Sequence, residues 1–112
     1  MADLLTRITL SALEDLKAQD VTRLDVTGLS DVMDQLIIAS GTSNRHVKSL
    51  AAHVVDQTKK AGHSAIGVEG METAEWVLVD FGDTVIHVML PQVRAVYDLE
   101  SLWSVTARPD DA

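Results

Sequence analysis

The chain has 112 residues, a length that suits one domain built around one hydrophobic core. It contains no cysteine, which excludes disulfides, thiolate zinc sites and cysteine nucleophiles. Seventeen acidic residues against nine basic ones give a net charge of −8, which disfavours binding to naked nucleic acid and favours attraction to a basic protein.

The N-terminal segment predicts a helix that Asp3 can cap and that continues to about Gln19. Four apolar residues recur in it at helical spacing: Leu5, Ile8, Ala12 and Leu16. The first residues lack a basic stretch followed by a long apolar run, and no apolar run approaches the roughly 18 residues that span a bilayer. We therefore expect a cytosolic protein without a membrane partner.

Two strands and a second helix are predicted next. Residues 21–26 alternate as a short strand, and residues 33–39 end in a continuous apolar run that is typical of a central strand covered on both faces. Residues 40–43 supply a turn and a capping hydroxyl. Apolar residues between 47 and 61 then follow helical spacing up to a C-terminal stop at Gly62.

The second half of the chain predicts three strands and a short helix. Residues 65–68 form a short strand, and residues 76–80 and 84–90 form an antiparallel hairpin around a turn at 81–83. A short helix is expected within residues 93–103. Residues 1–103 would form one domain, and the polar residues 104–112 would fray. The order of elements predicts an α/β (α+β) fold with a mixed sheet of about five strands and two main helices.

Both alternating sets of the hairpin are apolar. The sets are Trp76 with Leu78 and Val77 with Val79 on the first strand, and Val85 with Met89 and Ile86 with Val88 on the second. The pattern leaves open which sets share a face. Two long helices can cover one face of the sheet but hardly two, so part of the second face should form an apolar interaction patch. Trp76 is equally compatible with a core position and with an interface anchor.

Catalytic and metal sites are weakly supported. Residues 40–46 could hold a phosphate at a helix N-terminus, but they lack the spacing of a P-loop, so a helix cap is favoured. Asp25, Asp31 and Asp34 are interpreted as strand-end and turn residues. His46 and His53 are about 10 Å apart along one helix, too far to share a metal. His63 and His87 have no partner nearby in sequence, and we expect neither a metal nor a cofactor.

Several motifs, in order, resemble the ribosomal silencing factor family, also called Iojap. They are residues 17–20 (KAQD), 24–26 (LDV), 37–48 (IIASGTSNRHVK), 68–70 (VEG), 75–80 (EWVLVD), 82–83 (GD), 86–89 (IHVM) and 97–103 (YDLESLW). The resemblance implies binding to large-subunit ribosomal protein fourteen, which blocks joining of the small subunit and represses translation when nutrients are scarce. It also implies a nucleotidyltransferase-like fold without the catalytic carboxylates, and a homodimer of the free protein remains open.

Two departures from the family pattern stand out. Residues 33–36 (MDQL) lie where relatives more often have a threonine, the aspartate and two aromatic residues. Ala74 precedes Glu75 where a glycine is usual. Alanine is disfavoured at that position only if the backbone needs a positive φ, so we expect it to be tolerated.

The favoured hypothesis is a docking surface on the hairpin, where apolar anchors and acidic side chains meet a basic partner without a covalent step. The predicted docking residues are Glu69, Glu75, Trp76, Leu78, Asp80, Asp83 and Met89. One alternative is an enzyme of nucleotidyl transfer that uses Ser43 with Asp31 and Asp34. The other is a homo-oligomeric structural module in which the apolar face pairs with itself.

Overall fold

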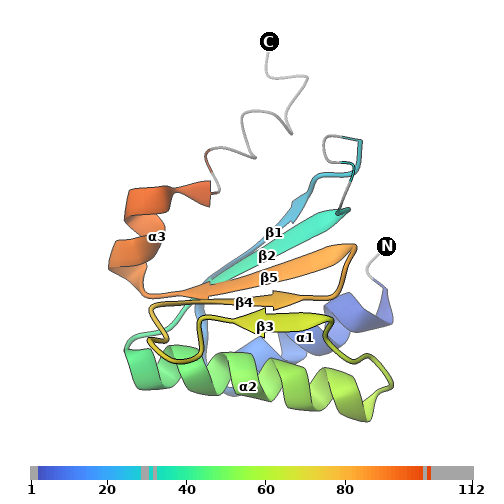
Figure 1. The fold of residues 1–112 in the computed structure, drawn as a ribbon, viewed down its shortest axis with the longest axis horizontal. Coiled ribbons are helices and arrows are strands. Elements are labelled where there is room, and N and C mark those ends of the chain that lie inside the picture. The colour runs from blue at the N-terminus through green and yellow to red at the C-terminus, as the bar shows by residue number, and fades with distance from the viewer. Residues whose placement is uncertain (1–2, 29–30, 32, 100, 102–112) are drawn as a thin grey trace.

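The computed structural model describes residues 3–28, 31, 33–99 and 101. The predicted frayed tail, residues 104–112, and the end of the predicted helix 93–103 lie outside these residues. Figure 1 shows the elements in chain order. They are α1 (Leu4–Asp15), β1 (Gln19–Asp25), β2 (Gln35–Ser40), α2 (Asn44–Lys60), β3 (Gly67–Glu69), β4 (Trp76–Asp80), β5 (Thr84–Met89) and α3 (Pro91–Tyr97).

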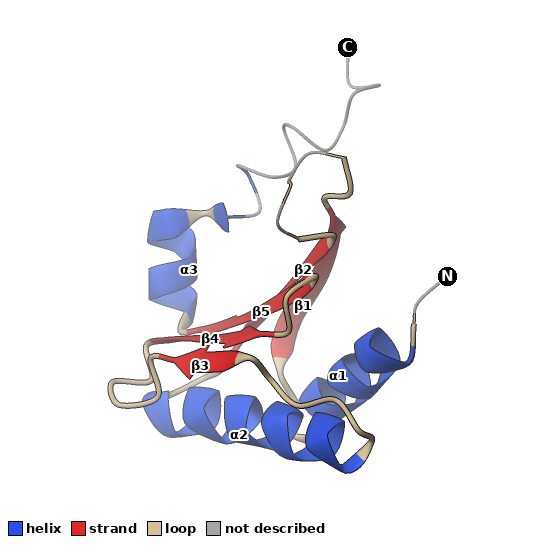
Figure 2. Cartoon of the chain, turned by 45° about the vertical axis from the view of Figure 1, so that its right-hand side comes forward, coloured by secondary structure: helices blue, strands red, loops and turns tan. Residues whose placement is uncertain are grey.

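The five strands form one mixed sheet in the order β1-β2-β5-β4-β3. The two strands β2 and β5 run parallel at its centre, and the other neighbours are antiparallel. Helices α1 and α2 lie side by side against one face, whereas α3 lies on the other (Figures 1 and 2). We call the first the helix face and the second the outer face. The predicted α+β fold with a mixed five-stranded sheet is confirmed.

Both long helices begin at the predicted caps. The Asp3 carboxylate accepts a hydrogen bond from the Thr6 N–H at 2.8 Å, which holds the pKa of Asp3 below its usual value. The Ser43 hydroxyl accepts one from the His46 N–H at 3.1 Å. Helix α1 ends at Asp15 rather than near Gln19, because Lys17 adopts a left-handed conformation with φ +60° and turns the chain into β1.

The core lies between the helix face and the two long helices. Val77, Val79, Ile86 and Val88 are fully buried there, and Leu50 of α2 packs in the same cluster. Each such side chain contributes about 1.5–3 kcal/mol by leaving water. This cluster fixes which way the hairpin faces, and so it also fixes which side chains the outer face presents.

Several predicted boundaries were displaced by one or two residues. Strand β2 begins at Gln35 instead of residue 33. At this start of the strand, the N–H groups of Asp34 and Gln35 both donate to the Asp83 carbonyl. Strand β3 covers residues 67–69 rather than 65–68. Helix α3 begins at Pro91 rather than Val93, since a proline suits the first helical position, where its missing N–H is not needed.

The expected tolerance of Ala74 is wrong in its premise. Ala74 has a φ of +54°, the left-handed region that favours glycine. It is also buried, and its N–H donates to the Gly70 carbonyl at 2.9 Å, so the turn holds it in place. Alanine in this conformation stores roughly 1–2 kcal/mol of strain just before β4.

Candidate docking surface

The register of the hairpin settles its facing. Trp76 pairs with Met89 and Leu78 pairs with His87. Because directly opposed residues share a face, His87 and Met89 lie on the outer face with Trp76 and Leu78. Both Trp76 and Leu78 are half-buried, while Val79 on the helix face is fully buried. The expected separation of the two sets is confirmed.

Trp76 is the centre of an aromatic cluster that we define as Trp76, His87 and Tyr97. The indole N–H of Trp76 donates a hydrogen bond to Nδ1 of His87 at 2.9 Å. The ring centroids of Trp76 and Tyr97 are 4.8 Å apart with the planes tilted by 49°, within the range of favourable aromatic pairs. Trp76 is thus held from β5 on one side and from α3 on the other.

His87 is neutral at ordinary pH. Its side chain is only 7% exposed, and burial lowers the pKa of His87 to about 4 because a charged imidazolium would lose its hydration. Since Nδ1 accepts the indole proton of Trp76, the ring proton of His87 lies on Nε2. The acceptor on Nδ1 is therefore available throughout the physiological pH range.

Hydrogen bonds of the Arg94 side chain connect helix α3 to the outer face. This buried guanidinium donates to the Ser40 hydroxyl at 2.9 Å and to the Thr22 hydroxyl at 3.2 Å, which joins α3 to β2 and β1. Met89 is fully buried on this face, so its predicted role as a docking residue is wrong. Met89 pairs in register with Trp76 but is not exposed to a partner. The exposed apolar patch is accordingly smaller than the sequence predicted.

A groove of about 430 Å³ lies between α3 and the turn that leads into β4. Its lining residues are Thr73, Glu75, Trp76, Gln92, Val93, Val96 and Tyr97. Val96 is 77% exposed and Tyr97 is 59% exposed, so the rim of the groove offers apolar surface to a partner. The lining contains one acidic and no basic residue, which suits a basic side chain.

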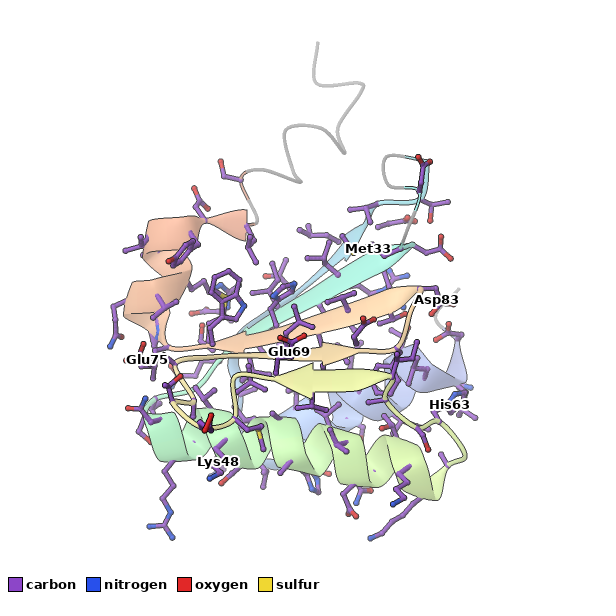
Figure 3. All side chains as sticks on the ribbon, in the orientation of Figure 1. Met33, Lys48, His63, Glu69, Glu75 and Asp83 are labelled. Atoms are coloured by element: carbon purple, nitrogen blue, oxygen red, sulfur yellow. The ribbon has the colours of Figure 1, made fainter. Side chains whose placement is uncertain are left out.

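The predicted acidic residues do not form one group. Glu69 pairs in register with Leu78 and is exposed on the outer face, and Glu75 is exposed beside Trp76. The Asp80 carboxylate instead accepts the Gly82 N–H at 2.7 Å and shapes the hairpin turn. Asp83 lies at that turn, at the opposite end of the sheet from Glu75 (Figure 3). Trp76 and Asp80 are four residues apart, about 13 Å along a strand, so only Glu69 and Glu75 flank the aromatic cluster.

The groups proposed for the enzymatic alternative are separated by the whole length of β2. Asp34 precedes the first residue of the strand and Ser43 follows its end, which places them roughly 20 Å apart. The Ser43 hydroxyl caps α2. Two strands flank β2 in the sheet: β5 carries no carboxylate, whereas β1 carries Asp20 and Asp25 near its two ends. In the described part of the chain, no cluster of three potential metal ligands occurs and no helix is long and apolar enough to cross a membrane.

Two histidines of α2 contact the C-terminal end of α1. The Nε2 atom of His46 contacts the Leu16 carbonyl at 2.7 Å, while its Nδ1 atom accepts the Thr42 N–H at 2.8 Å. His53 pairs with the Asp15 carboxylate at 3.0 Å. Both side chains therefore join the end of α1 to α2.

Sequence reasoning missed three residues that build the surface: His87, Arg94 and Tyr97. Only the hairpin register reveals that His87 lies beside Trp76, and a turn of three residues permits more than one register. The motif at residues 97–103 contains Tyr97, yet nothing in its spacing indicated a contact with β4. The fold and the aromatic cluster together define a small α+β protein with a candidate docking face opposite its two long helices.

Comparisons with known proteins identify the family. A family model described as ribosomal silencing factor during starvation matches residues 2–112. The ribosomal silencing factor of Chromobacterium violaceum is 48% identical over 99 residues, covering 88% of this chain and 81% of that protein. That of Haemophilus influenzae is 39% identical over 100 residues, covering 89% and 98%. A crystal structure of a Chromobacterium violaceum protein matches with a TM-score of 0.87 at 48% identity, covering 89% and 83% of the two chains. The chain belongs to the ribosomal silencing factor family.

Proposed function

We propose that the protein binds large-subunit ribosomal protein fourteen through its outer face and thereby blocks joining of the small subunit. Translation would then be repressed when nutrients are limiting. Membership of the family supports ribosome association, and the observation that carries the location of the site is the half-buried Trp76. An indole that is anchored by His87 and Tyr97, yet partly open to solvent, has the features of an interface anchor.

Charge supports a basic protein partner. The net charge of −8 disfavours direct contact with phosphate backbones, whereas a ribosomal protein that coats RNA carries the opposite charge. Glu69 and Glu75 lie beside Leu78 and Trp76, so two carboxylates form an acidic rim next to an apolar centre. This arrangement of rim and centre is common in protein–protein interfaces. The proposed action is steric and requires no covalent step by the residues of the rim or of the apolar centre.

The direct test follows the protein through a cell extract. If the docking face and the joining face of the large subunit overlap, the protein should sediment with free large subunits and be depleted from joined ribosomes. Trp76→Ala should shift it to the unbound fractions. Equal occupancy of free and joined subunits would overturn the steric mechanism, and turnover of labelled nucleoside triphosphates with Mg²⁺ would instead support an enzyme.

A further inference from the structure

The indole of Trp76 is held in place by a directional bond from a neighbouring strand. His87 lies on β5, diagonally across from Trp76 on β4, and both project onto the outer face. The hydrogen bond between the indole N–H and Nδ1 of His87 measures 2.9 Å, and the two rings are 5.9 Å apart with their planes tilted by 45°. An indole has only this one hydrogen-bond donor. Its partner therefore determines which way the ring points.

We propose that His87 is a positioning residue of the docking surface, which sets the indole of Trp76 in its docking orientation before the partner arrives. The inference rests on the proposed function, because it assigns a role within the same site. His87 is 7% exposed, so it acts through Trp76 rather than by touching the partner.

Preorganisation explains why this bond would strengthen binding. A side chain that is already fixed loses less rotational freedom when a partner packs against it. Tyr97 closes the side of Trp76 toward α3, whereas His87 holds the indole nitrogen on the side toward β5. The neutral state of His87 keeps the acceptor in place. Without that acceptor, the half-buried indole N–H would be drawn toward water and the ring would occupy more than one orientation.

Two substitutions separate positioning from simple stability. His87→Leu introduces an apolar side chain of moderate size and removes the acceptor, while the amide oxygen of His87→Gln can still accept the indole proton. Affinity for purified large-subunit ribosomal protein fourteen and the melting temperature would be measured for the full chain. The indole ¹H–¹⁵N signal of Trp76 would also be followed by NMR. The chain has two tryptophans, and Trp76→Phe identifies the signal.

We expect His87→Leu to weaken binding by about three- to tenfold, because the indole must then be ordered when the partner binds. The lost hydrogen bond should lower the melting temperature by no more than about 8 °C. Its Trp76 indole signal should shift or broaden. His87→Gln should restore both the signal and affinity within about twofold. Wild-type affinity and an unshifted indole signal in His87→Leu would overturn the inference.

The two proposals fail in different ways. If the wild-type protein does not bind the ribosomal protein, the proposed function and the docking role of His87 both fall. If the wild type binds and His87→Leu binds equally well, only the positioning role falls. The NMR signal is read without a partner, so it reports on the orientation of the indole in either case.

Discussion

The two faces of the β4–β5 hairpin carry side chains from the same two strands, yet they are covered differently. On the helix face, Val79 and Ile86 are fully buried beneath α1 and α2 by apolar packing. On the outer face, the hydrogen bonds of His87 and Arg94 tie the aromatic cluster and α3 to the strands. Trp76 and Leu78 there remain half-buried.

The difference indicates that one face of a small sheet can stabilise the fold while the other binds a partner. Apolar packing depends on volume and has little directional preference, so it can fill the helix face with valine and isoleucine. Hydrogen bonds are directional, so they can fix a large side chain that is still accessible to a partner. Substitutions on the helix face should therefore affect folding, and substitutions on the outer face should affect binding.

The largest loss of stability is expected on the helix face. Ile86→Ala should lower the free energy of unfolding by about 4 kcal/mol, because it leaves a cavity in the core. Leu78→Ala on the half-buried outer face should lower it by only about 1–2 kcal/mol. Chemical denaturation of both variants checks the comparison, and equal losses would show that the two faces are not energetically distinct.

A pH-dependent loss of slightly smaller size should come from His87. The pKa of His87 is about 4 in the folded protein against 6.5 ordinarily, so the unfolded chain binds more protons between these values. Stability should fall as the pH is lowered through this window, by up to about 3 kcal/mol in total.

The matched control is His87→Gln, which cannot titrate in this range and should flatten the curve between pH 6.5 and 4. Asp3 and Asp25 have lowered pKa values, so their stabilising effect is lost mainly below the ordinary value of 3.8, and it is the same in the wild type and in His87→Gln. Denaturation curves with the same pH slope for both proteins would contradict the assignment to His87.

A smaller effect is expected for the acidic rim. Glu69→Gln combined with Glu75→Gln should slow association with the ribosomal protein by about two- to fivefold at low salt and hardly change dissociation. Glu14→Gln with Asp56→Asn removes the same charge from α1 and α2. Stopped-flow measurements between about 0.05 and 0.5 M salt, where screening becomes strong, would compare the pairs. Equal slowing by both would point to net charge rather than to the rim.

The smallest effect is expected at the turn that carries the chain into the outer face. Ala74→Gly relieves roughly 1–2 kcal/mol of strain from the left-handed backbone conformation. It also removes a buried methyl group and raises the conformational entropy of the unfolded chain, and both of these changes lower stability. These terms nearly cancel, so stability should change by less than about 1 kcal/mol. Thermal melts check this, and a loss above about 2 kcal/mol would show that the Ala74 methyl group matters more than its backbone.

Local patterns predicted most of the fold. The capping Ser43 and the helical spacing after it located α2, and the alternation from Trp76 to Asp80 defined β4 with its correct ends. The same alternation separated Trp76 from Val77, because successive strand residues point to opposite faces. The coverage argument then indicated that one of the two sets lies on a less covered face, and the structure shows that this is the set of Trp76 and Leu78.

The remainder depends on contacts between segments that are distant in sequence. The hydrogen bond of His87 requires the hairpin register, and the burial of Met89 requires that the outer face be covered, neither of which alternation reveals. The bonds of Arg94 join α3 to residues 54 and 72 positions earlier in the chain. The positive φ of Ala74 follows from how its turn closes on Gly70. Spacing rules describe neighbours along one element and cannot supply these contacts.

The most direct measurement of the central claim pairs Trp76→Ala with Val79→Ala, two residues of one strand that face opposite sides. Affinity for large-subunit ribosomal protein fourteen and the free energy of unfolding would be measured for both variants. Trp76→Ala should weaken binding about thirtyfold or more, about 2 kcal/mol, with a smaller loss of stability. Val79→Ala should lose roughly 2 kcal/mol of stability and keep its affinity within about threefold. Wild-type affinity in Trp76→Ala, or a loss of 3–5 kcal/mol of its stability as for a core aromatic residue, would contradict a docking role for the outer face.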